Sequence, residues 1–475
     1  MSSSVSRTDK LILIAAIAIF ILLHIYQINS PPNGYHQWRE SDTAAIILNY
    51  YQEDANFLHQ HCNQRGANSG ITAGEFPTYS YASFILYYFF GPHHFLARLV
   101  TLAGGLAALW FFKKIVAIFS NERVAIYSTI ALCFSPMFLF YSFKIMPDMW
   151  MVMFMMGAVY YFLKYAESSL LKHFTISAIF MILSASTKPL SLCLYLPFLV
   201  YFLKKSENKK QVFLKMSIYF AVTFSVTLAW FLYGRYLNSI HQSQAIYMGE
   251  NLYKSLELTF QSMFFEKLFL QWPVELWIGW ALAPVFIYGA IKLWKDRQGR
   301  FYFIWIVASY IAFALVSVNA RRLDYYTLVI VPPLAAISGW GLAEIITRPM
   351  FRKIVIVFIL IILPAVTMFR IYHRFAEVPE FDLIRAGAQK HIPREALVIV
   401  QETTTSIRLY QLNRHGWPGR DELTLEKIQA LIEKGASYLV LDNPIELNEN
   451  DLKTLVIDSA FQIGPLYGYR TIKLD

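Results

Sequence analysis

Cysteines and charged side chains are scarce in this chain of 475 residues. Its three cysteines, Cys62, Cys133 and Cys193, are too few and too scattered for a disulfide framework, so we expect inert thiols. Only 16% of the residues are charged, against about 25% in typical soluble domains. This shortage of charge excludes a water-soluble fold for most of the chain.

Apolar side chains are correspondingly abundant: 56% of the residues are hydrophobic and 17% are aromatic. We predict an integral membrane protein, mainly α-helical, with about eleven spans. The spans are expected at residues 11–28, 99–118, 124–140, 149–163, 174–186, 190–203, 216–233, 276–293, 301–318, 325–343 and 354–369. Runs beside Asp148 and Lys188 are shorter than the roughly 20 residues that a crossing helix needs, so short tilted helices and re-entrant pairs both remain open.

Lysine and arginine residues are concentrated in every second loop between the apolar runs. The formal net charge is +10, but these side chains lie between apolar runs rather than on one soluble face, which argues against nucleic acid. Short cytoplasmic loops collect Lys and Arg, so the basic loops and the N-terminus are expected in the cytoplasm. The loops expected outside hold nearly all acidic residues before the C-terminal part: 29–98, 141–148, 187–189, 234–275 and 319–324.

The composition changes near residue 376, where charges of both signs mix with shorter apolar segments. We predict a transmembrane domain over 1–375, with its first outward loop at 29–98, and a small soluble α/β domain over 376–475. Because the N-terminus is expected in the cytoplasm, an odd number of spans places this second domain on the outer, extracytoplasmic side of the membrane. Its expected elements are strands at 396–401, 438–442 and 467–474 and helices at 425–434 and 447–459.

Polar and aromatic side chains converge on the outward face. Asp42 stands where the sequence predicts a helix start, and an N-cap role alone would account for it. Glu75 lies in the same loop, and Asp148 and Lys188 lie in the next two outward turns. The segment from Arg321 to Tyr326 adds cations and aromatic rings at a later span. Single charges at span ends are often only interfacial anchors, so it is the convergence that indicates a site.

Such a site suits a sugar carried on a lipid phosphate. Glycosyl transfer passes through an oxocarbenium-like transition state, in which a carboxylate deprotonates the attacking hydroxyl. Phosphate departs as a stable anion, and charge-assisted bonds from Arg and Lys stabilise the charge that develops on it. Carboxylates and cations on one face therefore indicate a glycosyl-transfer site.

A series of short motifs supports this interpretation. They are Arg39-Glu40-Ser41-Asp42, Gly74-Glu75-Phe76-Pro77-Thr78-Tyr79, Ala97-Arg98-Leu99-Val100, Met146-Pro147-Asp148, Thr187-Lys188-Pro189 and the stretch 322–326. In this order and topology, the sequence resembles the GT-C superfamily of membrane glycosyltransferases, in particular the bacterial relatives of protein O-mannosyltransferases and lipid A aminoarabinose transferase. The resemblance covers the whole membrane part and implies a GT-C bundle in a bacterial plasma membrane.

The resemblance also implies roles. Asp42 is the expected catalytic base of an inverting transfer of one sugar from a polyprenyl-phosphate donor to a glycolipid, polysaccharide or protein acceptor, with Glu75 and Asp148 as supporting catalytic carboxylates. The implied substrate ligands are Arg39, Glu40, Lys188, Arg321, Arg322, Tyr325 and Tyr326. Some relatives place a divalent metal near such carboxylates. Glu75 and His241 are the candidate ligands here, although no tight histidine spacing supports a metal.

Two other functions stay open. A transporter or flippase of lipid-linked sugars would also have many spans, but it would bury ionisable residues near the bilayer midplane, whereas the acidic groups here cluster in loops. An oligosaccharyl ligase would share the cationic outer mouth and transfer a preassembled glycan. The motifs favour transfer of a single sugar.

Overall fold

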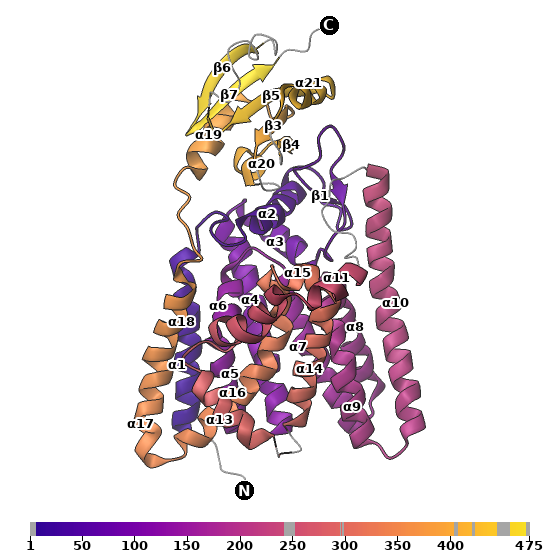
Figure 1. The fold of residues 1–475 in the computed structure, drawn as a ribbon, viewed down its shortest axis with the longest axis vertical. Helices are drawn as coiled ribbons and strands as arrows, with labels where there is room; N and C mark the ends of the chain where they lie inside the picture. Colours follow the sequence, from indigo (N-terminus) through magenta and orange to yellow (C-terminus); the bar gives the residue numbers. More distant parts are fainter. Residues whose placement is uncertain are drawn as a thin grey trace. The chain divides into compact units, whose positions relative to one another are not determined.

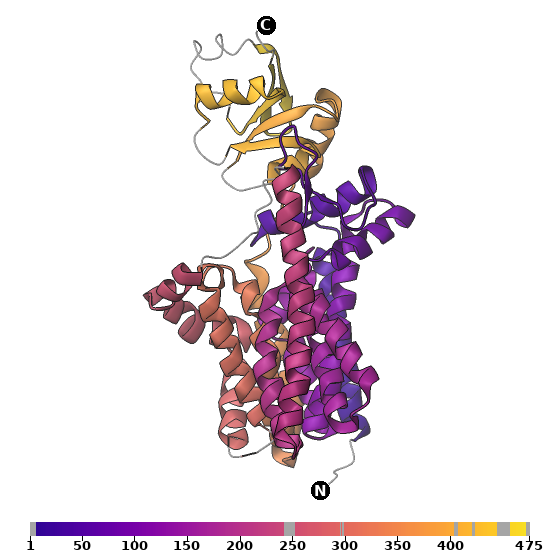
Figure 2. The ribbon, with the colours of Figure 1, turned by 90° about the vertical axis from the view of Figure 1, so that its right-hand side faces the viewer.

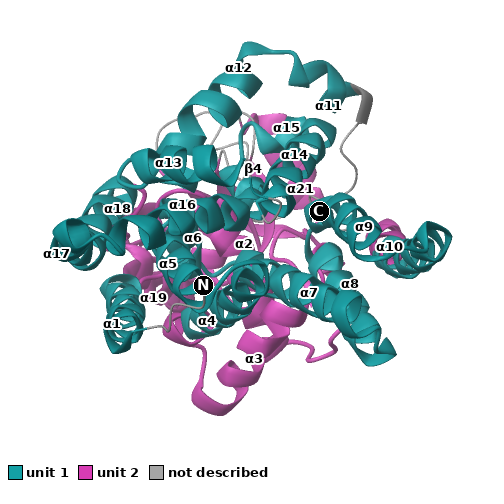
Figure 3. Cartoon of the chain, turned by 90° about the horizontal axis from the view of Figure 1, so that it is seen from below, with its two compact units in different colours: residues 1–28, 98–230, 249–373 teal, residues 29–97, 231–248, 374–475 magenta. Residues whose placement is uncertain are grey.

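The computed structural model describes residues 6–241, 252–294, 296, 299–402, 407–419, 423–443 and 457–471. The chain divides into two compact units, coloured separately in Figure 3. Unit 1 comprises residues 1–28, 98–230 and 249–373, and unit 2 comprises residues 29–97, 231–248 and 374–475.

Unit 1 is helical, and the eleven predicted apolar runs lie mostly in helices, with non-helical breaks at residues 28, 134–135, 278–282 and 316 (Figure 1). Its first elements are α1 (Arg7–His24), η1 (Ile25–Gln27), α4 (His94–Phe119), α5 (Glu122–Cys133), α6 (Pro136–Phe143), α7 (Asp148–Ser168), α8 (Leu171–Thr187), η2 (Pro189–Leu194), α9 (Tyr195–Lys205) and α10 (Lys209–His241). Residues 94–97 of α4 and 231–241 of α10 belong to unit 2. Then follow α11 (Leu252–Thr259), α12 (Ser262–Phe265), η3 (Glu266–Gln271), η4 (Pro273–Trp277), α13 (Ala283–Leu293), α14 (Arg300–Leu315), α15 (Ser317–Ala320), η5 (Asp324–Ile330), α16 (Val331–Ile346), α17 (Pro349–Val357), η6 (Phe358–Ile362) and α18 (Leu363–Tyr372).

Six helices in the described part of the chain are long and apolar enough to cross a membrane. They are Arg7–Gln27, His94–Phe119, Asp148–Ser168, Lys209–His241, Asp324–Ile346 and Pro349–Tyr372, and Figure 2 shows the fourth, α10, as one long helix. Helices α5 and α6 form a seventh if their 60° bend lies within one span, and α8, α13 and α14 are shorter apolar helices. The protein is therefore a multi-pass membrane protein, and its full span count stays a prediction.

Helix α16 and the turn before it form the centre of unit 1. Its apolar window is 83% buried, against 28% for the windows of α1 and α10. Glycines let the neighbouring helices approach: a Cβ added to Gly339 would overlap the backbone of Ser128 in α5, and one added to Gly341 would crowd the Val285 carbonyl of α13. Small residues at such crossings replace hydrophobic burial as the means of helix packing in lipid.

Unit 2 contains the first outward loop and the C-terminal residues. Its elements are α2 (Gln37–Gln52), β1 (Gln60–His61), β2 (Ile71–Thr72), α3 (Thr78–Phe90), α19 (Phe381–His391), β3 (Leu397–Gln401), α20 (Ile407–Leu412), β4 (His415–Gly419), α21 (Leu425–Glu433), β5 (Ala436–Leu441), β6 (Ile457–Ile463) and β7 (Leu466–Thr471). Five strands form one sheet in the order β4-β3-β5-β7-β6, in which β3 is parallel to β4 and β5 while β7 is antiparallel to β5 and β6.

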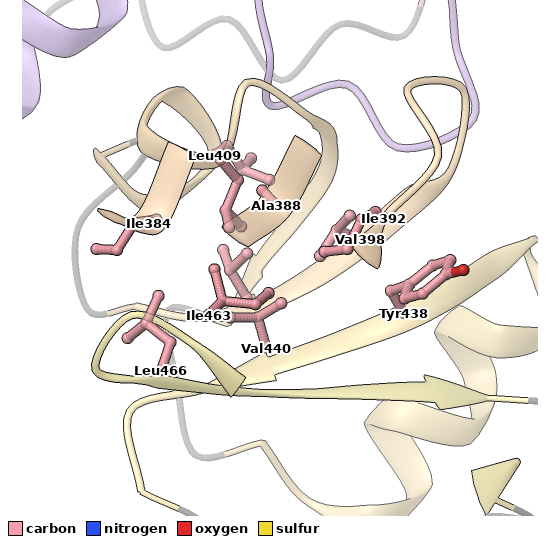
Figure 4. Packing of buried hydrophobic residues seen from close by; sticks show 11 residues of the cluster. Ile384, Ala388, Ile392, Val398, Leu409, Tyr438, Val440, Ile463 and Leu466 are labelled. Atoms are coloured by element: carbon pink, nitrogen blue, oxygen red, sulfur yellow. The ribbon is translucent and has the colours of Figure 1, made fainter. Parts of the chain in front are cut away.

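The sheet is covered by apolar clusters on both faces. Val398 and Val400 of β3 belong to the cluster beneath α19 and α20, which Figure 4 shows in close-up. Ile399, between them, belongs to the opposite cluster with Ile428 of α21. This alternation follows from the two-residue period of a strand. It explains why β3 reads as a continuous apolar run with helices on both sides.

Sequence patterns predicted β3, α21, β5 and β7 to within a few residues. The helix expected at 447–459 is wrong over residues 457–459, which begin strand β6, and its earlier part lies outside the described residues. Strand β6 pairs only with β7 at the edge of the sheet. The two strands form a hairpin whose turn is Gly464 and Pro465, so this strand is set by pairing with its neighbour rather than by the helical spacing of residues 447–459.

Backbone bonds join the first outward loop to the C-terminal sheet within unit 2. Gly66 donates to the Gly416 carbonyl at 3.0 Å, and Gly416 donates to the Asn63 carbonyl at 3.1 Å. Gly66 has φ +55° and faces the Trp417 ring, which leaves no room for a Cβ. The sequence places this loop in the transmembrane domain, whereas in the structure it clusters with the residues after 374.

Candidate functional site

The predicted site residues of unit 1 gather around a buried ion pair. Helix α7 begins at Asp148, directly after Pro147, and α8 ends at Thr187 because Pro189 cannot continue it. These two helix ends bring the Lys188 ammonium into hydrogen-bonding contact with the Asp148 carboxylate. The side chains are 6% and 0% exposed. A buried charge is tolerated when it is paired in this way, so each side chain compensates for the burial of the other.

Aromatic rings complete the surroundings of Lys188. Its ammonium lies 3.9 Å from the ring centroid of Tyr325 and 5.2 Å from that of Tyr326. Both tyrosines belong to η5, which leads into α16. The negative face of an aromatic ring attracts a cation, most strongly where water is excluded. The structure therefore brings together four of the predicted residues: Asp148, Lys188, Tyr325 and Tyr326.

Tyr141 is a member of this cluster that the sequence did not single out. Its hydroxyl donates to the Asp324 carboxylate, and its ring meets that of Tyr325 edge-on at 6.0 Å. Both Tyr141 and Asp324 are fully buried. Tyr141 stands at the end of an apolar aromatic run, so in the sequence it looks like an ordinary residue of a membrane span. Its position at the start of the 141–148 turn is the feature that could have marked it as a site residue. Asp324 was quoted only as part of the Arg321 to Tyr326 segment.

Arg321 and Arg322 directly precede this segment and differ in setting. Arg321 is buried and donates to the Gln261 side chain at 2.6 Å, whereas Arg322 is exposed. Burial and the neighbouring Arg322 charge both lower the pKa of Arg321. Arg322 is thus the solvent-accessible cation of the pair, and Arg321 links η5 to the segment before α12.

In unit 2, helix α2 carries the residues of the acidic motif. Arg39 and Asp42 are three positions apart and so share one face of the helix. The Arg39 guanidinium pairs with the Glu75 carboxylate, with side chains 5% and 18% exposed. Glu40 is buried on another face and accepts from the Asn33 backbone N–H at 3.2 Å. Arg39 and Glu75 are thus brought together, while Glu40 closes the loop before the helix.

Asp42 is not a helix cap. Helix α2 begins at Gln37, after His36 in the left-handed conformation (φ 62°), so Asp42 lies in the second turn. The N-cap alternative is therefore wrong, because that role requires a non-helical residue at the helix start. Burial and then the Asp42 charge raise the pKa of the Cys62 thiol to about 12. Asp42 is half-buried, and the Oδ2 atom of its carboxylate is shielded from solvent.

The two candidate metal ligands have other partners. Glu75 pairs with Arg39, and the Nδ1 atom of His241 lies 2.9 Å from the Ser69 hydroxyl. Among the described residues, no three His, Cys, Asp or Glu side chains are grouped to hold a metal ion. This donor set does not fit a metal centre as arranged here, and we assign no chemical step to one.

The described structure combines a polytopic helical bundle, a small mixed sheet, charged and aromatic residues at helix ends and a carboxylate on the first loop helix, and the comparisons that follow assign its fold to the GT-C glycosyltransferase class. Residues 75–233 match the family model of dolichyl-phosphate-mannose-protein mannosyltransferase. This match covers α3 to the middle of α10 and includes Asp148 and Lys188. A search of curated proteins finds no significant match.

Solved structures share the fold across nearly the whole chain. ArnT from Cupriavidus metallidurans in the apo state is 14% identical, with TM-score 0.70, covering 96% of this chain and 98% of that one. The same protein bound to undecaprenyl phosphate is 15% identical, with TM-score 0.64 and 98% coverage of both chains. An oligosaccharyltransferase from Archaeoglobus fulgidus, in complex with Zn and sulfate, is 15% identical, with TM-score 0.61, covering 97% of this chain and 73% of that one. These likenesses confirm the GT-C resemblance at the level of the fold.

Proposed function

We propose that this protein is an inverting glycosyltransferase that moves a single sugar from a polyprenyl-phosphate donor to an acceptor at the outer face of a bacterial plasma membrane. The observation that carries the proposal is the near-complete structural match to ArnT, whose structure holds undecaprenyl phosphate. The mannosyltransferase family model over residues 75–233 supports the same class of donor. The basic loops support a cytoplasmic N-terminus and an outer catalytic face.

The proposed reaction is a direct displacement. The acceptor hydroxyl oxygen forms a bond to the anomeric carbon, while the bond from that carbon to the phosphate oxygen breaks. The acceptor proton passes to the Asp42 carboxylate, and the polyprenyl phosphate departs with the bonding electrons. One displacement inverts the anomeric configuration, as in other transfers through oxocarbenium-like states.

The remaining residues bind and orient. Lys188, Arg321 and Arg322 supply positive charge for the donor phosphate, and Tyr325 and Tyr326 offer flat faces to the sugar or the lipid. Asp148 acts through Lys188, which it holds in place by the ion pair, and Glu75 acts in the same manner through Arg39. Glu40 holds the loop that leads into α2. We propose Asp148 and Glu75 as positioning residues rather than as proton acceptors.

Asp42→Asn is the direct test of the proposed base. Purified protein would be incubated with a panel of undecaprenyl-phosphate hexoses and pentoses and with glycolipid and protein acceptors. Loss of a general base costs about 10²–10⁴-fold in rate. We therefore expect the variant to lose at least about 100-fold in kcat with an unchanged melting temperature. Asp54→Asn, a carboxylate of the same loop that pairs with His59 at 3.3 Å, is the matched control. Full activity of Asp42→Asn on a substrate pair that wild type uses would overturn the assignment.

Transfer of a preassembled oligosaccharide is the second candidate, favoured by the fold match to the archaeal oligosaccharyltransferase. Mass spectrometry of the product separates the two reactions, because the acceptor then carries a polymer rather than one sugar. Vesicles that accumulate lipid-linked sugar on the far leaflet without glycosyl transfer would instead indicate a flippase. Comparing surface glycans of cells with and without the protein identifies sugar and acceptor together.

A further inference from the structure

A cavity of about 680 Å³ opens in unit 1 where helix α9 ends and helix α14 begins. Its volume lies within the range of small-molecule sites. Aromatic side chains of three helices form its floor: Phe119 from the end of α4, Tyr201 from α9 and Phe301 from α14. Lys204, Lys205 and Arg300 form its rim. The proposed reaction does not use the rim cations.

The floor consists of three aromatic rings in mutual contact. The rings of Phe119 and Phe301 stack at 4.6 Å, and Tyr201 meets them edge-on at 5.5 Å and 6.0 Å. Phe119 and Phe301 are buried, so this floor is part of the packed core rather than a mobile surface. Helical packing of α4, α9 and α14 therefore fixes its shape.

The rim carries positive charge without a paired carboxylate. Within the described residues, Lys204, Lys205 and Arg300 form no ion pair, and the cavity lining contains no acidic side chain. Glu167 is the carboxylate that interacts electrostatically with Tyr201. Its Oε2 atom lies 3.6 Å from the Nζ atom of Lys164, so it pairs with that lysine rather than with a rim cation. Helix α14 begins after Gly299, which has no side chain to cap its first N–H groups. The positive end of that helix thus adds to the three cations.

A lipid-facing stripe continues from the cavity along α14. Ile304 lines the cavity, and Val307, Ile311 and Leu315 are 54%, 52% and 45% exposed. Their spacing of three or four residues places them on one face of the helix. An acyl chain would bury apolar surface against this stripe, whereas a water-soluble anion would make no favourable contact with it.

We propose that this cavity binds the phosphate headgroup of an anionic phospholipid, with its acyl chains along the α14 stripe. The basic loops put the site in the cytoplasmic leaflet, where anionic headgroups attract Lys and Arg clusters. The floor rings contact the glycerol region, and Lys204, Lys205 and Arg300 contact the phosphate. The site is separate in its residues from Asp148, Lys188 and the other proposed reaction groups.

Native mass spectrometry of the full-length protein, released from nanodiscs of phosphatidylglycerol and phosphatidylcholine, tests this assignment. We expect wild type to retain phosphatidylglycerol. The variant Lys204→Ala/Lys205→Ala/Arg300→Ala should retain at least about tenfold less of this lipid. The control, Lys210→Ala/Arg348→Ala/Lys353→Ala, removes the same charge from exposed positions outside the cavity and should bind like wild type.

Three outcomes would overturn the proposal. Equal phosphatidylglycerol retention by the rim variant excludes these cations, and equal loss in the control shows a general charge effect. Displacement of the lipid by inorganic phosphate at millimolar concentration indicates a soluble-anion site.

If the triple variant does not fold, Lys204→Gln/Lys205→Gln carries the same expectation, since both side chains are exposed at a helix end. Val307→Asn should weaken lipid retention while leaving the rim intact.

Discussion

Lys188 and Asp148 are neighbours because the C-terminus of α8 lies beside the N-terminus of α7. One residue follows α8 and the other begins α7, and their side chains form an ion pair that is almost completely removed from solvent. The Tyr325 ring lies over the same ammonium. This arrangement fixes the position of a cation without exposing it to water, which is the state in which it interacts most strongly with a phosphate.

The pair makes a prediction about stability. Asp148→Asn should destabilise the protein by about 3–5 kcal/mol, because it leaves a buried ammonium without its counter-ion. Replacing both residues, as Asp148→Leu/Lys188→Met, should cost clearly less. Reversible unfolding in detergent measures both. Glu167→Gln, which removes an exposed partner of Lys164, is the control and should cost under about 1 kcal/mol. A single variant as stable as this control would refute the importance of the pair.

A second prediction concerns Arg39 and Glu75. If Glu75 acts through Arg39, then Glu75→Gln should slow the transferase, and adding Glu75→Gln to Arg39→Lys should cost little more. A double-mutant cycle on kcat/KM should therefore show coupling of about 1.5–3 kcal/mol, typical of hydrogen bonds to charged groups. Additive losses would instead indicate that Glu75 contacts the substrate independently.

Helix packing gives a third prediction. Gly339→Ala should destabilise the protein by about 1–3 kcal/mol, because the new Cβ would overlap the Ser128 backbone and force α16 away from α5. Gly105→Ala is the matched control, since its Cβ would meet Ser142 and Met149 at ordinary contact distances of 3.5 Å and 3.6 Å. Thermal unfolding in detergent compares the two. Equal melting temperatures would show that the α5–α16 crossing relaxes without cost.

A fourth prediction concerns pH and the joint between the first loop and the sheet in unit 2. His415 lies 3.0 Å from Glu53. Burial lowers the pKa of His415 below its usual 6.5, and the hydrogen bond with Glu53 opposes this only in part. Burial raises the pKa of Glu53, but hydrogen bonds from His415 and Arg65 outweigh it and lower that pKa to about 2. Glu53 therefore stays ionised throughout mild acidification.

The sign follows from proton binding. Just below pH 6.5 the unfolded state binds more protons at His415 than the folded state does, so stability falls as the pH falls through this range. Hydrogen exchange of β4 and of residues 63–66 should accelerate from pH 7 to pH 5.5, after correction for intrinsic exchange. His415→Gln should flatten this dependence, while His93→Gln, an exposed histidine, should not. An unchanged pH dependence in His415→Gln would assign it to another group.

The sequence predicted the helices of unit 1 better than the arrangement of its charges. The apolar runs are mostly helical, because a backbone in lipid must satisfy its own hydrogen bonds locally, although non-helical residues divide three of them between two helices. The role of Tyr141 was not visible, since its aromatic ring looks the same in a membrane run as in a polar cluster. The start of α2 was also missed, because His36 enters the helix from a left-handed conformation rather than from a standard cap.

By itself, the amino-acid sequence determined that this is a multi-pass membrane protein, which segments are helical and which loops collect positive charge. These are properties of single segments, set by hydropathy and backbone hydrogen bonding. Tertiary structure alone decided that Lys188 meets Asp148, that Arg39 meets Glu75, that β6 is a strand and that Gly339 marks a helix crossing. The two ion pairs and the helix crossing join residues far apart in the chain, and the β6 strand depends on its hairpin pairing with β7. The periodicity of a single segment does not contain this information.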